Sequence, residues 1–358
     1  MGIRELARHL NISIGTVSRA LNGKADVHPE TRARVLEAAE RLGYAPTQSG
    51  RSLRRGATGM IGMMIPTSDK TALSDTIFMT VVDGLRGFLS ARNLDLVLLL
   101  CGPEEDAFAY TKRVVERRIV DGLIIADTQR VDPRIDYLIA RKMPFVTFGR
   151  SLSGGSQPWV DMNFEGMAED AVRRLTDLGH KRIAMAQPAS EINYGYICAE
   201  AFSEAIRKRG GDCHGVLMRA EVNEAGGYAL GETLLAARPR PTALILANVD
   251  MAIGLYRRLN EAGVRPGVDL AIVGFNAGPH CKFLAPALTC YQTDLTSLGA
   301  RLGEALLARM SDHTPLAPGE IVQDVRPMRP IRGESDNRLG ARPSSRPAPP
   351  RRVASQRR

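Results

Sequence analysis

The most constraining feature of the sequence begins at Met60, where short apolar runs start to alternate with stretches whose apolar residues recur at helical spacing. Strands that are apolar along their whole length and alternate with helices along the chain are typical of parallel sheets covered on both faces. The apolar runs form two series, at 60–65, 94–100, 119–126, 144–148 and 159–161, and at 182–187, 215–219, 242–247 and 269–275. The sequence therefore predicts an α/β fold with two doubly wound subdomains.

The helices expected between these runs lie at 77–91, 104–117, 132–142, 163–178, 196–209, 223–237 and 249–262. Near the end of this region, a helix at 294–310 lies between runs at 287–292 and 320–326, which are expected to cross between the halves. We therefore predict an N-subdomain of about 59–160 plus 292–319 and a C-subdomain of about 161–291 plus 320–331. Doubly wound folds bind ligands beyond the carboxyl ends of their strands, so a small-molecule site is expected between the subdomains.

The beginning of the chain follows another pattern. Its expected features are an apolar stripe over 3–10, a turn at Asn11, an N-cap at Ser13, a second stripe over 17–21 and a third helix over 29–42. Two short helices joined by a tight turn are the outline of a helix-turn-helix, whose second helix enters the major groove of DNA. Taken alone, the stretch also fits a helical pair that only packs.

The net charge of +9 is unevenly distributed along the chain. Residues 1–58 have a net charge of +5 and residues 332–358 one of +6, which leaves −2 on the long middle part. A basic head on a near-neutral body is typical of a phosphate-binding module attached to a different kind of domain. Residues 332–358 are rich in Arg and Pro and nearly lack apolar residues, so we predict a disordered basic tail.

Residues 46–58 are the expected linker between the head and the body. They combine helix breakers with arginines and one conspicuous apolar residue, Leu53. One interpretation is a disordered basic tether. The other is a segment that becomes helical on DNA and inserts Leu53 into the minor groove.

Several classes of protein are disfavoured by what the sequence lacks. The five cysteines are an odd number with no Cys-x-x-Cys pair, which predicts reduced thiols rather than disulfides or a zinc site. The apolar runs are too short to span a bilayer, and the N-terminus does not resemble a signal peptide. Neither a phosphate-binding glycine loop nor a nucleophile elbow is present. We therefore expect a cytoplasmic protein without membrane partner, metal, cofactor or catalytic residues.

The chain resembles the lactose-repressor (LacI/GalR) family of bacterial transcription regulators over about residues 1–333. The N-terminal stretches with this resemblance are Thr16-Val17-Ser18-Arg19-Ala20-Leu21-Asn22, Glu30-Thr31-Arg32-Ala33-Arg34-Val35, Leu42-Gly43-Tyr44-Ala45-Pro46, Arg51-Ser52-Leu53 and Ile61-Gly62. The later ones are Val160-Asp161-Met162-Asn163, Leu178-Gly179-His180-Lys181-Arg182-Ile183-Ala184 and Val273-Gly274-Phe275. The N-terminal set is the more specific because it is ordered and closely spaced.

The resemblance implies a DNA-binding domain at 1–45, a hinge helix at 46–58, and an effector-binding and dimerisation domain at 59–331 like that of periplasmic sugar-binding proteins. It further implies a homodimer in the bacterial nucleoid that binds a near-palindromic, double-stranded operator. The residues at family DNA-contacting positions are Ile14, Gly15 and Arg19 for bases, Thr16, Ser18 and Asn22 for phosphates, and Arg51 and Leu53 in the hinge. Arg19 is able to donate two hydrogen bonds to a guanine edge, whereas Ile14 offers only apolar contact.

The predicted effector contacts depart from the family pattern. The candidates are Phe78, Arg150, Asp161, Asn193, Tyr194, Cys198, Asn248, Asp250 and Asn276. Cys198 stands where the family usually has an effector-contacting Arg, and Asn276 stands where it usually has Asp. These changes remove a bidentate donor and a strong acceptor for hydroxyl groups. Structural roles compete at several positions, such as a core position for Phe78 and helix capping for Asp161.

The favoured function is a repressor of sugar uptake or catabolism genes whose operator binding is controlled by a small sugar-like effector. In this hypothesis the ligand shifts a population between two arrangements of the effector domain, and this change releases or supports the hinge helices. A constitutive DNA-binding regulator with a lost or non-sugar effector is the main alternative. A transport receptor and a sugar-processing enzyme are further alternatives that the sequence disfavours.

Overall fold

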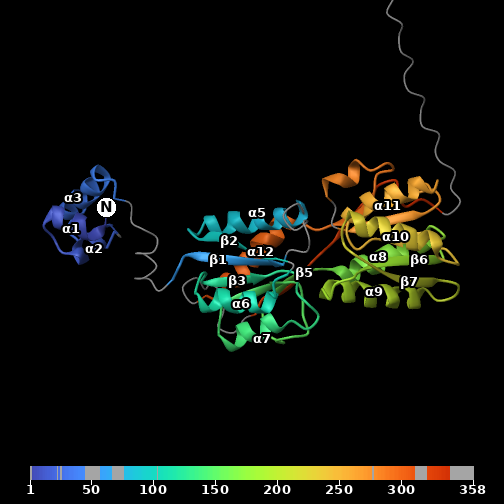
Figure 1. The fold of residues 1–358 in the computed structure, drawn as a ribbon, viewed down its shortest axis with the longest axis horizontal. Coiled ribbons are helices and arrows are strands. Elements are labelled where there is room, and N and C mark those ends of the chain that lie inside the picture. Colours follow the sequence, from blue (N-terminus) through green and yellow to red (C-terminus); the bar gives the residue numbers. More distant parts are fainter. Residues whose placement is uncertain are drawn as a thin grey trace, which may run out of the picture. The chain divides into compact units, whose positions relative to one another are not determined.

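The computed structural model describes residues 2–21, 23–24, 26–44, 57–66, 76–102, 104–275, 278–310 and 321–338. Its contacts divide the chain into two compact units (Figure 1). The first unit is Met1–Gly59 with Ile119–Asp121, and the second is Met60–Arg118 with Gly122–Arg358. None of the described helices is long and apolar enough to cross a membrane.

Three helices form the first unit: α1 (Ile3–Leu10), α2 (Ile14–Leu21) and α3 (Pro29–Arg41). Asn11 ends α1 in the left-handed conformation, with φ at 53°, and Ser13 Oγ accepts a hydrogen bond of 3.0 Å from the Thr16 N–H at the start of α2. Both features confirm the predicted turn and N-cap. Leu6, Val17 and Val35 are fully buried where the helices meet, so one small core holds α2 in place.

The described strands of the second unit form two six-stranded sheets. The first has the order β11 (Gln323–Arg326), β5 (Trp159–Met162), β4 (Phe145–Phe148), β3 (Gly122–Ile125), β1 (Met60–Pro66) and β2 (Asp95–Cys101). The second has the order β12 (Arg329–Ile331), β10 (Thr289–Gln292), β9 (Ala271–Phe275), β8 (Ala243–Ile245), β6 (Arg182–Pro188) and β7 (His214–Ala220). The paired strands run parallel, except that β12 is antiparallel to β10. We call the part built on the first sheet the N-subdomain and the part built on the second the C-subdomain. The predicted α/β fold with two doubly wound subdomains is confirmed.

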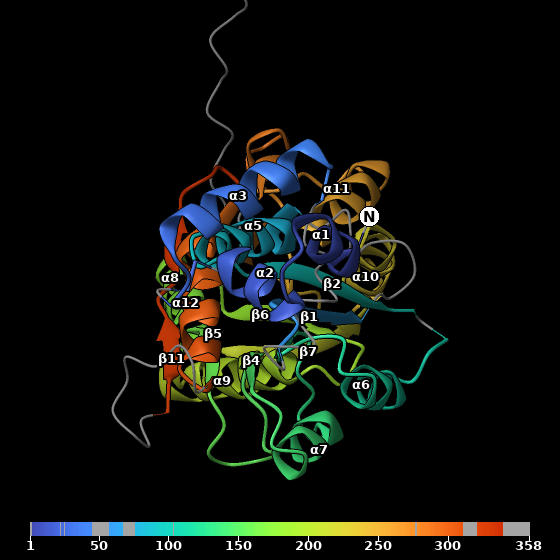
Figure 2. The same ribbon diagram turned by 90° about the vertical axis from the view of Figure 1, so that its left-hand side faces the viewer.

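The N-subdomain contains β1 (Met60–Pro66), α5 (Thr76–Ser90), β2 (Asp95–Cys101), α6 (Ala107–Glu116), β3 (Gly122–Ile125), α7 (Pro133–Ala140), β4 (Phe145–Phe148), β5 (Trp159–Met162), α12 (Leu295–Leu307) and β11 (Gln323–Arg326). Helices α5 and α12 cover one face of its sheet, and α6 and α7 cover the other (Figures 1 and 2). Glycines bring α5 and α12 close together, because a Cβ on Gly84 would lie 2.2 Å from the Thr296 carbonyl oxygen.

The C-subdomain contains α8 (Phe164–Asp177), β6 (Arg182–Pro188), α9 (Asn193–Arg209), β7 (His214–Ala220), α10 (Glu224–Ala236), β8 (Ala243–Ile245), α11 (Asp250–Glu261), β9 (Ala271–Phe275), the 3₁₀ helix η1 (Pro279–Lys282), β10 (Thr289–Gln292) and β12 (Arg329–Ile331). Helices α8 and α9 pack together on one face of the sheet, and α10 and α11 pack together on the other (Figure 1). Strands β8 and β9 are fully covered, as their continuous apolar sequences predict.

Two predicted subdomain boundaries are wrong. The sequence pattern places segment 320–326 in the C-subdomain, but β11 pairs with β5 in the N-subdomain sheet, where Asp324 lies opposite Val160. The first crossing was placed at residue 160, whereas β5 continues in the N-subdomain sheet to Met162. The physical reason is that sheet membership depends on pairing with a strand distant in sequence, which local hydropathy does not encode.

The predicted disordered tail at 332–358 is wrong for its first residues, because 332–338 is an ordered segment of the C-subdomain. Ser335 is 0% exposed, donates to the Ile272 carbonyl oxygen at 2.6 Å and accepts from the Thr289 N–H at 2.9 Å. Asp336 is also buried and accepts hydrogen bonds from Arg174 and Thr289. Buried polar side chains order the segment without apolar residues. Residues 339–358 lie outside the described part of the chain.

This C-terminal segment generates a prediction about stability. Asp336→Ala is expected to lower the free energy of unfolding by about 2 kcal/mol, because it removes the acceptor that Arg174 and Thr289 share. Urea unfolding followed by circular dichroism measures the change. Glu334→Ala is the matched control, since this nearby carboxylate is exposed and its loss should change stability by less than about 0.5 kcal/mol. Equal effects of the two substitutions would contradict the structural role of Asp336.

Candidate functional site

Helix α2 exposes the side of the first unit that the sequence assigns to DNA bases. Ile14 is 42% exposed, Gly15 is exposed, and the Arg19 side chain is 52% exposed. Val17 and Ala20 are buried in the core and Leu21 packs against it, so the helix presents its other side, with Ile14, Gly15 and Arg19, to the solvent. Arg19 pairs with the exposed Asp26 at 3.5 Å, a contact weak enough for a DNA ligand to displace.

The start of α2 combines hydroxyl groups with the positive end of the helix. Ser13 Oγ and Thr16 Oγ1 are hydrogen-bonded at 2.9 Å, and both lie in the first turn. Helix N-termini favour anions because their first N–H groups have no partner in the helix. Thr16 and Ser18 are partly exposed, which leaves both accessible to a phosphate. Asn22, Arg51 and Leu53 lie outside the described residues.

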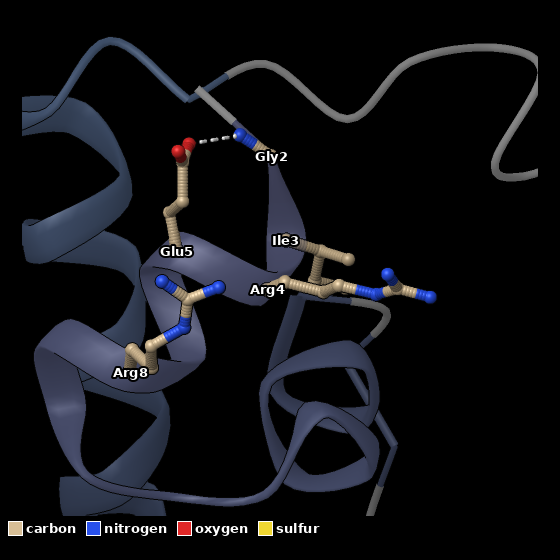
Figure 3. Close-up of a pocket in the computed structure, with 5 residues that line it drawn as sticks. All are labelled: Gly2, Ile3, Arg4, Glu5 and Arg8. Atoms are coloured by element: carbon tan, nitrogen blue, oxygen red, sulfur yellow. Dashed lines mark hydrogen bonds between the residues drawn. The ribbon is translucent and has the colours of Figure 1, made fainter.

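A shallow pocket lies at the beginning of α1 and is lined by Gly2, Ile3, Arg4, Glu5 and Arg8 (Figure 3). Within it the Gly2 N–H donates to Glu5 Oε2 at 2.8 Å, which closes the helix start. The pocket belongs to the surface of the first unit and contains none of the predicted effector contacts. It is therefore a feature of the helix end and not a candidate effector site.

Arg150 is the centre of the polar network in the second unit. It follows β4, and its Nε donates to Asp161 Oδ2 of β5 at 2.7 Å. Its Nη1 and Nη2 donate to the two oxygens of Glu165 in α8 at 2.7 and 2.9 Å. One guanidinium thus binds a carboxylate of the N-subdomain and a carboxylate of the C-subdomain, the second in bidentate geometry.

Burial and ion pairing shift the pKa values of these three side chains in opposite directions. Burial raises the pKa of Asp161, and the Arg150 guanidinium opposes this rise. Burial also acts to raise the pKa of Glu165, but the hydrogen bonds from Arg150 and from its own backbone N–H, together with the charge of Arg150, outweigh burial and lower this pKa. Burial alone would lower the pKa of Arg150, while the two carboxylates raise it above the usual value for arginine. Arg150 consequently favours the ionised form of Asp161, against the effect of its burial.

Asn193 connects the start of α9 to the N-subdomain. Its Nδ2 donates to the Arg150 carbonyl oxygen at 2.7 Å, and its backbone N–H donates to the Thr128 carbonyl oxygen at 2.9 Å. Nearby, Arg130 pairs with Glu200 of α9 at 2.9 Å. Three of the predicted effector contacts, Arg150, Asp161 and Asn193, therefore meet at one place, where the subdomains touch.

Tyr194 belongs to an aromatic cluster beside this network. Its ring is stacked on that of Phe164 with centroids 5.2 Å apart, and it meets the Phe275 ring edge-on at 5.8 Å. Phe164 begins α8, Tyr194 lies in the first turn of α9, and Phe275 ends β9. The cluster thus joins three elements at one end of the C-subdomain sheet.

The other predicted contacts have local structural partners. Asn248 Oδ1 accepts from the Asp250 N–H at 3.2 Å, which supports the start of α11. Cys198 is only 4% exposed, and burial raises the pKa of its thiol, so it stays neutral within α9. Phe78 is half-buried on α5 against the core. Asn276 lies outside the described residues.

Sequence reasoning missed Glu165 and Phe164, although both follow the expected crossing between the subdomains. Glu165 is in the first turn of a helix, where an acidic residue is ordinarily explained by the helix dipole. Only its distance from Arg150 reveals the second role. Phe164 was included in an expected helix and had no signal that separated it from a core residue.

Comparisons with known proteins agree with both units. Residues 2–47 match the family model of bacterial regulatory proteins, lacI family, and residues 172–335 match the model of a periplasmic binding protein-like domain. The chain is 32% identical over 313 residues to the HTH-type transcriptional regulator AglR of Rhizobium meliloti (strain 1021), covering 86% of this chain and 87% of that protein.

Two solved structures are also similar to the chain. A LacI family transcriptional regulator from Enterococcus faecium with bound ribose has a TM-score of 0.66 and 26% identity, covering 78% of this chain and 99% of that one. The lac repressor dimer bound to operator and the anti-inducer ONPF has a TM-score of 0.80 at 20% identity, covering 94% and 99%. At 20% identity, the similarity to the second structure is a similarity of fold.

The dependence of Asp161 on Arg150 predicts a change in the pH dependence of folding. In Arg150→Met the buried Asp161 loses its cation, so its raised pKa should rise further above the value of about 3.9 in an unfolded chain. Between these two pKa values the folded variant keeps a proton on Asp161 that the unfolded chain has lost. The free energy of unfolding therefore falls as the pH rises from the unfolded pKa to the raised pKa of Asp161. Urea unfolding should show a loss of about 3 kcal/mol relative to wild type at pH 8 and a smaller loss at pH 5.

The control for this prediction is the double variant Arg150→Met/Asp161→Asn. It lacks the buried carboxylate, so the added pH dependence should disappear while the loss of packing by Arg150 remains. A pH dependence that persists in the double variant would assign the effect to another group.

Proposed function

The chain belongs to the lacI family of bacterial regulatory proteins, and on that premise we propose that it is an operator-binding repressor controlled by a small uncharged sugar. The observation that most supports the proposal is the order of the two matched regions, a lacI-type head followed by a periplasmic binding protein-like domain. The family consists of transcription regulators, so the chain is not an enzyme. We place its action in the cytoplasm, on the DNA of the nucleoid.

Base reading is assigned to the exposed side of α2. Arg19 is the residue there with hydrogen-bonding capacity for a guanine edge, and Ile14 is suited to a thymine methyl group. A Cβ at Gly15 would meet Ser13 Oγ at 3.6 Å, an ordinary contact, so packing within the head does not require glycine. Glycine at this position leaves room for the DNA surface. Asn22, Arg51 and the Leu53 wedge complete the proposed interface, and a homodimer would present two such heads to a near-palindromic operator.

The effector is assigned to the place where Arg150, Asp161 and Asn193 meet, together with Tyr194, Asn248, Asp250 and position 276. The related regulator from Enterococcus faecium binds ribose, which supports a sugar. Carboxylates and amides both bind hydroxyl groups, and an aromatic ring packs against the apolar face of a sugar. Arg150 is already paired with two carboxylates, so it offers no uncompensated charge to a phosphate. We therefore favour an uncharged sugar over a phosphorylated one.

Control is proposed to occur through a population shift. A ligand that binds one arrangement of the two subdomains more tightly favours that arrangement, and a ligand that binds both equally changes nothing. A constitutive regulator without an effector remains the second candidate, because the Arg150 side chain is paired with two carboxylates, the Asn193 amide donates to the Arg150 carbonyl oxygen, and Cys198 is buried. Binding experiments separate the two.

Arg19→Ala is expected to relax sequence preference. It removes the donor assigned to guanine, so the affinity for the preferred operator should fall by about 1–3 kcal/mol, with little change for unrelated DNA. Sites selected from a random DNA library by the wild type and the variant, followed by fluorescence anisotropy at one salt concentration, measure this. Arg34→Ala removes an equal charge from the exposed side of α3 and should leave the selected sequence unchanged. An unaltered preference in Arg19→Ala would place the reading residue elsewhere.

A ligand panel tests the effector proposal. Neutral mono- and disaccharides and their phosphorylated forms are compared for their effect on operator affinity. We expect at least one neutral sugar to change this affinity about tenfold, within the usual range of allosteric coupling, and the matching phosphate to have no effect. A response to phosphates alone would contradict the argument from Arg150. No response to any sugar would favour the constitutive regulator.

A further inference from the structure

Two cysteines face each other inside the C-subdomain. Cys281 lies in η1 and Cys290 in β10, and the Cys290 thiol donates a hydrogen bond to Cys281 Sγ across 3.4 Å. Cys281 is 5% exposed and Cys290 is 0% exposed. Two thiols from different elements in direct contact are a different case from isolated buried cysteines, because each sulfur has a bonding partner within reach.

The two cysteines are held by structures of unequal rigidity. Cys290 is in an inner strand, with Gly274 of β9 on one side and Ile331 of β12 on the other. Cys281 is attached through its backbone, with its N–H donating to the Gly278 carbonyl and its carbonyl accepting from the Leu288 N–H. The residues that directly follow it are exposed. A short movement of this single 3₁₀ turn would open Cys281 to solvent or bring its sulfur closer to Cys290.

The hydrogen bond makes the two thiols chemically unequal. Donation from Cys290 stabilises the Cys281 thiolate and lowers the pKa of Cys281, while the same bond and burial raise the pKa of Cys290. A thiolate attacks oxidants, and a neighbouring thiol resolves the oxidised sulfur. Cys281 thus has the properties of the attacking residue and Cys290 those of the resolving one.

The other cysteines provide an internal comparison. Burial raises the pKa of Cys101, of Cys198 and of Cys213. The Cys101 thiol donates to the Glu105 carbonyl oxygen, a contact that offers no sulfur for a disulfide. Reactivity toward oxidants is therefore expected first at Cys281.

We propose that Cys281 and Cys290 form a redox-active pair that hydroperoxides convert into an intramolecular disulfide. The Cys281 thiolate attacks the peroxide oxygen, the O–O bond breaks, and a sulfenic acid forms with release of hydroxide. The Cys290 sulfur then attacks the oxidised sulfur, the S–S bond forms, and the sulfenic oxygen leaves as water. In total, two thiols and one hydrogen peroxide give one disulfide and two waters, and a dithiol reductant restores the thiols.

Peptide mapping tests the proposal on the full chain. Lys282 lies between the two cysteines, so trypsin places them in separate peptides, residues 259–282 and 283–301. After treatment of the reduced protein with hydrogen peroxide, we expect these peptides to appear as one disulfide-linked species that dithiothreitol separates. The number of alkylatable thiols per chain should fall from the five of the sequence to three, a loss of two.

Variants supply the controls. Cys281→Ser and Cys290→Ser should each abolish the linked species, while Cys213→Ser should retain it. Unchanged circular dichroism spectra establish that the variants are folded. If a serine variant does not fold, the wild-type map alone decides, since the linkage is read directly from the peptides. Five alkylatable thiols after peroxide treatment, first oxidation at another cysteine, or a disulfide between two chains would overturn the proposal.

Discussion

The arrangement of the second unit depends on three short crossings between its two sheets. The chain passes from β5 to α8 at residue 163, from β10 to α12 between residues 292 and 295, and from β11 to β12 between residues 326 and 329. Three connections of this length limit relative motion of the subdomains mainly to rotation about the crossings, because each backbone is tied to a sheet or helix at both ends. The first crossing is surrounded by Asp161, Asn163 and Glu165. A rotation of the subdomains about this crossing would change the distances between Arg150 and its two carboxylate partners.

Most of the fold was predictable because parallel strands covered on both faces need continuous apolar sequences. Strands β3 and β9 are fully buried, and their ranges fall within the apolar runs expected for them. The prediction for strand β11 is wrong because its short sequence mixes polar and apolar residues and does not indicate that β5 is its pairing partner. The segment at 332–338 was missed for another reason. It is ordered by the hydroxyl of Ser335 and the carboxylate of Asp336, and composition reports apolar burial but not specific hydrogen bonds.

The candidate site likewise has features that the sequence predicts and features that it does not. Arg150 and Asp161 are predictable because one follows a strand end and the other stands at a crossing, where doubly wound folds gather ligand contacts. Asn193 is predicted only as a replacement for effector contacts that the family usually has. Their contacts with one another were not predictable, because a side chain long enough to reach a ligand is also long enough to reach a neighbour. Glu165 is the clearest example, since its bidentate pairing with Arg150 depends on how α8 is placed relative to β4. In the head, the pattern predicted α2 and its N-cap directly, because both depend on residues close in sequence.

The network around Arg150 suggests how a neutral ligand is able to act on this domain. Glu165 is partly exposed and Asp161 is buried, so the two carboxylates hold Arg150 with unequal strength. A sugar hydroxyl that accepts from Arg150 would replace a hydrogen bond to Glu165 without adding charge, and it would leave the contact between Arg150 and Asp161 in place. A phosphate would instead face Asp161 and Glu165 at close range. Under the proposed function, exchange of the Glu165 contact would also release a tie between the subdomains, and one guanidinium would then link ligand binding to subdomain arrangement.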